Sequence, residues 1–212
     1  MITVADYDPA WPELFDRLRR EYAEAFAKAR VPVLAIEHVG STSVPGLAAK
    51  PVIDCDIVVA GCDVSAAIDL LIRLGFSPLG EAGIPQRWAF AEPTRLAGTN
   101  TYVIVDGSLS LKNHRAVRDT LRGHPELRER YATVKKKLGS TARSLEEYGK
   151  GKNAVIQEIL TAAGLTEAER ASIDANKLPS PNDIAVATTA SYQRSNKPLR
   201  VLSAAEKPQD LE

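Results

Sequence analysis

The stretch HVGSTSVPGLAAKPVIDCD, residues 38–56, joins two predicted strands through a loop rich in glycine, serine and proline. A β-branched run at residues 33–39 leads into this loop and an apolar run at residues 52–59 follows it, and both runs are typical of strands. Side chains alternate between the two faces of a strand, so Asp54 and Asp56 point the same way, about 6.5–7 Å apart. One face of an otherwise apolar strand therefore holds two carboxylates.

The acidic pair and the loop before it indicate a binding site for phosphate groups. Two carboxylates in a buried strand are costly unless a cation neutralises them. Mg²⁺ is the expected cation because it prefers oxygen ligands and bridges carboxylates to substrate phosphates. Gly40 lets backbone N–H groups approach a phosphate, and Ser41 and Thr42 add hydroxyl donors. Lys50 adds a positive charge, so the pattern predicts a metal-bound nucleoside triphosphate.

Composition gives little support to several other classes of protein. Lysine and arginine together number 27, as do aspartate and glutamate, so the overall charge does not favour wrapping of nucleic acid or binding to a membrane surface. The chain has no run of about 18 apolar residues and does not begin with the basic and then apolar pattern of a secretory signal. Cys55 and Cys62 indicate neither a disulfide framework nor a zinc site. We therefore expect a soluble, cytoplasmic protein.

The remaining sequence predicts one α+β domain followed by a tail. Helical periodicity alternates with short strand-like runs in the first half, and helices follow one another in the second half. The expected helices span 10–30, 63–74, 111–122, 125–138 and 145–163, with a short one ending at 176, and the further strands span 76–79, 87–91 and 101–105. This order predicts a small mixed β-sheet with flanking helices and a helical C-terminal half within residues 1–165, and a partly irregular tail at residues 166–212.

Residues 37–51, EHVGSTSVPGLAAKP, followed by Asp54, resemble the signature of the GrpB family, a branch of the polymerase-β-like nucleotidyltransferase superfamily. Gly-Ser followed by Asp-x-Asp about a dozen residues later is moderately specific for the superfamily, and the Ser-Thr-Ser-Val-Pro-Gly-Leu segment narrows the resemblance. The resemblance runs from about residue 5 to 163 and includes residues 7–11, 115–122 and 124–125, and Tyr148 and Lys152.

The resemblance implies a nucleotidyltransferase-like fold and a third carboxylate on a strand beside the acidic pair, which would complete the metal site and act as a base. Asp106 is the candidate for this third catalytic carboxylate, and Glu92 is the second choice. The chain departs from the family at residues 101–103, Thr-Tyr-Val, where the family has a His-x-His pattern. Two interpretations of His38 stay open: it is a structural histidine beside the loop, or it donates a hydrogen bond to the ligand.

The helical half carries a local excess of positive charge. Residues 112–152 contain twelve Lys or Arg against five Asp or Glu. Arg115 and Arg118 are three residues apart and can share a helix face, and the resemblance makes them and Lys152 expected contacts of the phosphates or the substrate. Residues 135–137, Lys-Lys-Lys, are interpreted as a solvated helix surface.

We expect an enzyme in which Asp54 and Asp56 hold Mg²⁺ or Mn²⁺ together with the phosphates of ATP or another nucleoside triphosphate. An oxygen of a small-molecule acceptor, either a hydroxyl or a carboxylate, attacks the α-phosphorus. A nucleotidylated carboxylate passed on to an amine would make the net reaction a ligation.

Two further hypotheses stay open. The chain is a nucleotide-binding module without turnover, as the departure at residues 101–103 suggests, or a helper protein that acts on a partner through its basic helices or its tail. Nucleic acid is not an expected partner, because the basic segments carry neither interleaved aromatic residues nor a recognisable nucleic-acid-binding module.

Overall fold

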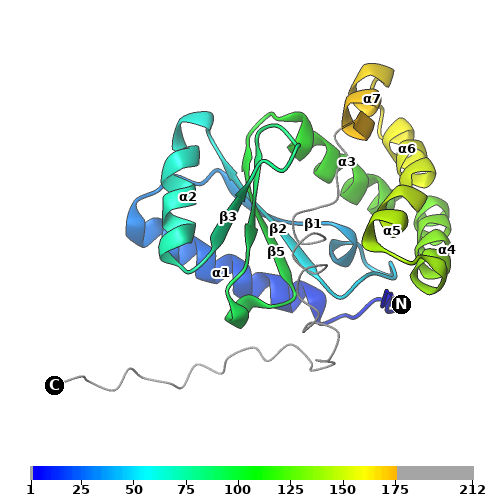
Figure 1. Ribbon diagram of the computed structural model, residues 1–212, viewed down its shortest axis with the longest axis horizontal. Coiled ribbons are helices and arrows are strands. Elements are labelled where there is room, and N and C mark those ends of the chain that lie inside the picture. Colours follow the sequence, from blue (N-terminus) through cyan, green and yellow to red (C-terminus); the bar gives the residue numbers. More distant parts are fainter. Residues whose placement is uncertain (1, 176–212) are drawn as a thin grey trace.

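The computed structural model describes residues 2–175, which form a mixed five-stranded sheet with helices around it (Figure 1). The strands are β1 (Ala35–Val39), β2 (Ile53–Val59), β3 (Ser77–Gly80), β4 (Arg87–Ala91) and β5 (Thr99–Val105). Their order in the sheet is β1-β2-β5-β4-β3. Only β2 and β5 run parallel, and the other neighbouring strands are antiparallel. The acidic strand β2 is therefore an inner strand, with β1 on one side and β5 on the other.

One face of the sheet packs against α1 (Trp11–Ala29) and α2 (Val64–Arg73). The aromatic side chains that α1 presents at helical spacing, among them Phe15, Tyr22 and Phe26, are buried against Cys55 and Ile57 of β2. Because neighbours along a strand alternate between faces, this packing turns the two aspartates of β2 to the opposite face.

The opposite face carries α3 (Leu109–Gly123), and the later helices gather beside it (Figure 1). They are α4 (Pro125–Thr141), α5 (Leu145–Gly151), α6 (Asn153–Ala162) and α7 (Glu167–Ala175). Val44 and Leu47, from the loop between β1 and β2, are buried in a second apolar cluster with residues of α3, α4 and α6. This packing fixes the loop between the sheet and the helical half.

The structure confirms the predicted α+β fold with a mixed sheet and a helical C-terminal half. Every predicted helix and strand before residue 145 forms close to its expected bounds. The expected helix at 145–163 is divided at Lys152 into α5 and α6. Helix α7 lies beyond the expected domain boundary at residue 165 and packs through Ile173 on Leu160 of α6. The expected irregular tail lies outside the described residues, except for the part up to residue 175.

Among residues 2–175, none of the helices is both long enough and apolar enough to span a membrane.

Candidate functional site

The loop after β1 brings its backbone against the first aspartate of β2. Gly40 has φ +68°, a conformation that L side chains rarely adopt, and a Cβ at this position would overlap Oδ2 of Asp54 and lie 2.8 Å from its Cγ. The antiparallel register that pairs Val39 with Asp54 creates this approach. The glycine expected to allow close backbone approach to a phosphate therefore stands directly beside the carboxylate expected to hold the metal.

The hydroxyl of Thr42 and the imidazole of His38 hold the loop in place. Thr42 Oγ1 donates to the carbonyl oxygen of Val52 at 2.9 Å, so it accepts from His38 Nε2 at 3.0 Å. His38 also stacks on Phe15, with the ring centroids 4.6 Å apart. Burial, followed by the charges of Arg122 and Arg118, lowers the pKa of His38 to about 4, so the ring is neutral at pH 7. These contacts fit the structural interpretation of His38 and occupy the hydroxyl of Thr42.

Asp54 lies beside an amide on the neighbouring strand. The parallel register pairs Asp54 with Asn100 of β5, and Asn100 Nδ2 donates to Asp54 Oδ1 at 2.7 Å. Burial raises the pKa of Asp54, although the hydrogen bond from Asn100 and the charge of His114 oppose the shift. A cation beside Asp54 would lower this pKa again and favour the carboxylate form.

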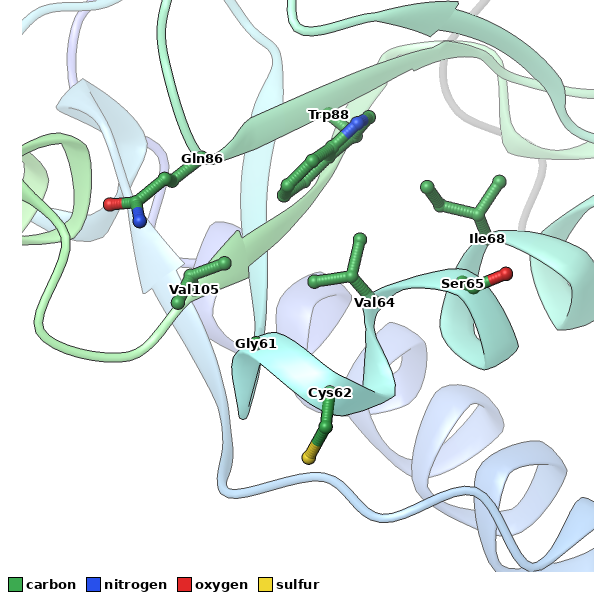
Figure 2. Close-up of a pocket in the computed structure, with 8 residues that line it drawn as sticks. All are labelled: Gly61, Cys62, Val64, Ser65, Ile68, Gln86, Trp88 and Val105. Atoms are coloured by element: carbon green, nitrogen blue, oxygen red, sulfur yellow. The ribbon is translucent and has the colours of Figure 1, made fainter.

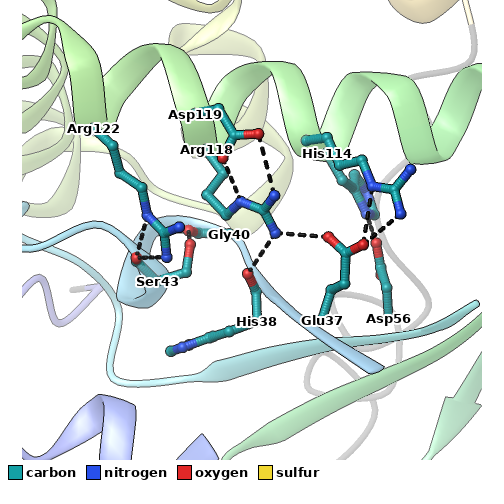
Figure 3. A network of polar contacts seen from close by, with 10 residues as sticks. Glu37, His38, Gly40, Ser43, Asp56, His114, Arg118, Asp119 and Arg122 are labelled. Carbon is teal, nitrogen blue, oxygen red and sulfur yellow. Dashed lines mark hydrogen bonds and ion pairs between the residues drawn. The ribbon is translucent and has the colours of Figure 1, made fainter. Parts of the chain in front are cut away.

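Asp56 is fully buried and is paired with a histidine that the sequence did not single out. Its Oδ2 accepts a hydrogen bond from His114 Nδ1 of α3 at 2.7 Å (Figure 3). Its other oxygen, Oδ1, has no hydrogen-bond partner among the described residues. A buried carboxylate oxygen without a partner is rare and costly, which indicates a missing cation or donor.

The structure separates Asp106 from the two aspartates, which corrects the expected grouping. The backbone N–H of Asp106 donates to the carbonyl of Val59 at 2.9 Å, which places Asp106 at the C-terminal end of β2. Asp54 lies five residues before Val59 on β2, which corresponds to about 16 Å along the strand. Glu92 instead accepts from the backbone N–H of Thr101 at 2.7 Å. Within residues 2–175, no three or more His, Cys, Asp or Glu side chains are grouped so that they could hold a metal ion.

Three arginines on one face of α3 hold β1 and the loop. Arg115 and Arg118 both form ion pairs with Glu37 of β1, and the Arg118 bond to Glu37 Oε2 is 2.7 Å long (Figure 3). Arg122 donates from Nη2 to the carbonyl of Ser43 at 2.7 Å. The structure thus places Arg115 and Arg118 against Glu37 rather than against Asp54. The spacing of Arg115 and Arg118 was visible in the sequence, but their carboxylate partner was not.

Replacing Glu37 with glutamine is expected to lower the free energy of unfolding by about 1–2 kcal/mol at pH 7, because two arginines lose their shared counter-charge. Burial by itself raises the pKa of Glu37, but the hydrogen bonds from Arg115 and Arg118 outweigh burial and hold the pKa below its usual value. A lowered folded-state pKa stabilises the protein above the unfolded-state pKa, about 4.3, and this stabilisation is lost as the pH falls further.

Urea unfolding of wild type and Glu37→Gln at pH 7 and pH 3 measures this effect. The difference between the two proteins should shrink at pH 3, and an equal difference at both values would contradict the assignment.

Lys135 is a buried lysine beside the loop, which corrects the interpretation of this residue as part of a solvated surface. The side chain is only 2% exposed, and its Nζ has no hydrogen-bond partner among residues 2–175. Nζ lies 4.5 Å from the ring centroid of Tyr131. Burial, and then the charge of Lys152, lower the pKa of Lys135 to about 6, whereas Asp54 opposes the shift.

The other expected lysines lie in the same region. The charge of Lys50 opposes the rise in the pKa of Asp54, and the charge of Asp54 opposes the fall in the pKa of Lys135. Lys152 Nζ lies 4.5 Å from the ring centroid of Tyr148. Of the expected phosphate-binding residues, Gly40 and Lys50 therefore lie near Asp54, Ser41 belongs to the same loop as Gly40, and Lys152 lies near Lys135.

A cleft of about 470 Å³ lies at the opposite end of the sheet from Asp54. Figure 2 shows that its wall is mainly apolar, with Val64 and Ile68 of the α2 segment facing Trp88 of β4 and Val105 of β5. Cys62 is its one cysteine, and the lining residues include no charged side chain. This cleft therefore offers no groups for phosphate or metal chemistry, and the candidate site remains the loop with the aspartates.

Comparison with known proteins identifies the family. The family model described as GrpB protein matches residues 1–162. The chain belongs to the GrpB family. A UPF0157 protein of Halalkalibacterium halodurans is 34% identical over 168 residues, which cover 78% of this chain and 84% of that protein. A UPF0157 protein of Streptomyces coelicolor is 35% identical over 170 residues, which cover 77% of this chain and 84% of that protein.

Two solved structures align with this chain. The crystal structure of the conserved protein GrpB from Enterococcus faecalis aligns with a TM-score of 0.66 at 30% identity, covering 76% of this chain and 96% of that one. The structure of the GLD-2/RNP-8 complex aligns with a TM-score of 0.50 at 13% identity, covering 98% of this chain and 75% of that one. The second likeness concerns the fold alone. The chain thus shares the fold of the Enterococcus faecalis GrpB protein, and a related fold is found in the GLD-2/RNP-8 structure.

Proposed function

We propose that this GrpB-family chain binds a nucleoside triphosphate together with a divalent metal ion and transfers its nucleotidyl group to a small-molecule acceptor. The site is formed by Gly40, Ser41, the two aspartates of β2 and Lys135. The proposal makes the chain an enzyme of the nucleotidyltransferase type, with ATP or another nucleoside triphosphate as its substrate.

One observation carries this proposal: two buried polar atoms near the loop, one on an acidic side chain and one on a basic side chain, lack a hydrogen-bond partner among residues 2–175. Asp56 Oδ1 is a buried acceptor without a donor or a cation, and Lys135 Nζ is a buried amine without an acceptor or an anion, which a bound phosphate would return to its charged form. They do not satisfy one another. A complex of a metal ion with a triphosphate supplies both missing partners at once, because it presents a cation on one side and phosphate oxygens on the other.

The residues present fit a magnesium ion held partly by its substrate. Mg²⁺ is commonly bound through one or two carboxylates, with waters and substrate phosphates as the other ligands. Asp54 and Asp56 supply two carboxylates from the same face of β2, and the unpartnered Oδ1 of Asp56 is an available ligand. When bound, such an ion would neutralise negative charge on the α-phosphate and on the leaving pyrophosphate.

The other residues of the site would bind the phosphates and orient the two aspartates. The backbone at Gly40 and the ammonium of Lys135 would hold phosphate oxygens, with Lys50 and Lys152 adding positive charge. Asn100 fixes Asp54 through the bond from its Nδ2, and His114 fixes Asp56 through Nδ1. An acceptor oxygen would form a bond to the α-phosphorus. The bond between the α-phosphorus and the oxygen that bridges it to the β-phosphorus would break, and pyrophosphate would leave with that oxygen.

Asp54→Asn tests the proposal. We expect wild type to release pyrophosphate from at least one of the four common ribonucleoside triphosphates, with Mg²⁺ and a panel of hydroxyl and carboxylate acceptors. The variant should release it at least about 100-fold more slowly, because one metal ligand loses its charge. Asp69→Asn, on α2 at the other face of the sheet, serves as the control. Equal release by wild type and Asp54→Asn would overturn the assignment.

A nucleotide-binding module without turnover is the second candidate, and Asn100 favours it. Asn100 occupies the position on β5 that pairs with Asp54, and it supplies an amide there, whereas the candidates for a third carboxylate, Asp106 and Glu92, lie elsewhere. Such a module would show an increase in thermal stability with Mg²⁺ and a triphosphate, but no pyrophosphate with any acceptor. Measuring both properties on the same preparation separates the two functions.

A further inference from the structure

Arg87 of β4 is a buried arginine whose guanidinium group lacks an acceptor. The residue is 6% exposed, and neither Nε nor Nη2 has a hydrogen-bond partner among residues 2–175. Arg17 and Arg170 also have an unpaired buried Nε, but each donates from Nη1 to a neighbouring side chain. In Arg87 the unpaired atoms are Nε and Nη2 together, which form one edge of the guanidinium.

The register of the sheet places Arg87 on the same face as the aspartates. Tyr102 of β5 pairs with Asp56 on one side and with Ala89 of β4 on the other, and Arg87 is two residues from Ala89. The guanidinium carbon of Arg87 lies 4.6 Å from the centroid of the Tyr102 ring. The Tyr102 ring also contacts His114, with centroids 6.0 Å apart. The side chain of Tyr102 thus lies between the unpaired arginine edge and the Asp56–His114 pair.

The chemistry of this edge points to a carboxylate. Two parallel N–H groups of a guanidinium match the two oxygens of a carboxylate, and a buried arginine normally has such a partner. A carboxylate carries the single negative charge that balances one guanidinium. The triphosphate carries several charges and has its own cations, Lys135, Lys50 and Lys152, on the side of Asp54 that faces the loop.

We propose that Arg87 binds a carboxylate of the acceptor, so that the acceptor is a small organic acid. The role of the bound acid as an acceptor rests on the proposed nucleotidyl transfer. The binding of a carboxylate by Arg87 does not depend on turnover. The stacked ring of Tyr102 orients the guanidinium, and Arg87 is therefore a specificity-determining residue.

The first test observes Arg87 directly. Nitrogen-15-labelled protein is titrated with acetate, succinate and glutamate, each compared with its uncharged amide, and the Nε–H resonance of Arg87 is assigned with Arg87→Met. We expect that resonance to move with at least one acid and with none of the amides. If no acid moves it, or if the amides move it equally, the inference is overturned.

The second test uses the proposed reaction, with Arg95→Met as the matched control, because Arg95 pairs with Glu21 on the surface. Arg87→Met should raise the KM for an acidic acceptor at least about tenfold and leave the triphosphate-induced rise in Tm unchanged. An unchanged KM would overturn the role of Arg87. If the triphosphate does not raise the Tm of wild type, the proposed function is overturned instead. The resonance test would still show whether Arg87 binds a carboxylate.

Discussion

Gly40→Ala is expected to lower the free energy of unfolding by about 2–4 kcal/mol, the largest loss from any single methyl group at this site. Part of the cost arises from φ +68°, which alanine adopts only with strain. The larger part arises because the new Cβ would overlap Oδ2 of Asp54 and lie 3.0 Å from the Cβ of Asp54. Rotation of the carboxylate cannot relieve the contact with Cβ. Asp54 or the loop must move, so phosphate binding should be lost as well.

Gly107→Ala separates the two causes. Gly107 has φ +75°, and a Cβ there would meet nothing within 4 Å, so this variant carries the backbone strain without the overlap. We expect it to lose about 1 kcal/mol in urea unfolding experiments. Equal losses in Gly40→Ala and Gly107→Ala would mean that the loop does not press against Asp54.

Lys135→Met is expected to raise the free energy of unfolding by about 1–3 kcal/mol at pH 7 and to weaken triphosphate binding at least about 100-fold. Methionine keeps most of the apolar length of the side chain and removes a buried amine that has no hydrogen-bond partner among residues 2–175 and must lose its proton on folding at pH 7. A gain in stability combined with a loss of binding is the behaviour of a residue retained for its function.

The pH dependence of this gain follows from the lowered pKa of Lys135. Between the folded-state pKa, about 6, and the unfolded-state pKa, about 10.4, the unfolded chain binds more protons, so wild-type stability rises with pH relative to the variant. The advantage of Lys135→Met is therefore full at pH 6 and shrinks towards pH 9. Lys136→Met is the control, because Lys136 is exposed and pairs with Asp6. A loss of stability in Lys135→Met at pH 6 would contradict this account.

Much of the fold could be predicted because its signals are local. The β-branched runs around the Gly-Ser loop, the spacing of Phe15, Tyr22 and Phe26 on α1, and Pro125 at the start of α4 each determine an element over a few residues. The side of the strand that carries Asp54 and Asp56 followed from alternation alone. Helices α5 and α6 were predicted as one helix because the backbone at Lys152 stays helical and helical periodicity continues across it, although Gly149 and Gly151 stand just before the division.

The site could be predicted only in part because its remaining contacts join distant segments. Nothing local distinguishes Lys135 from Lys136, and only the packing of α4 against the loop buries the first of them. Asn100 faces Asp54 because β5 enters the sheet beside β2 with a particular register, which the sequence does not reveal. Asp106 was chosen by its nearness to the end of β5, but a parallel strand places that end far from Asp54.

The most direct test of the metal and triphosphate site is a calorimetric titration of the protein with non-hydrolysable analogues of the four ribonucleoside triphosphates, with Mg²⁺ and then with EDTA. We expect wild type and Lys136→Met to bind at least one analogue with Mg²⁺, EDTA to abolish this binding, and Lys135→Met to bind at least about 100-fold more weakly. Failure of wild type to bind any of the four, equal binding by wild type and Lys135→Met with Mg²⁺, or binding that persists in EDTA would contradict the account.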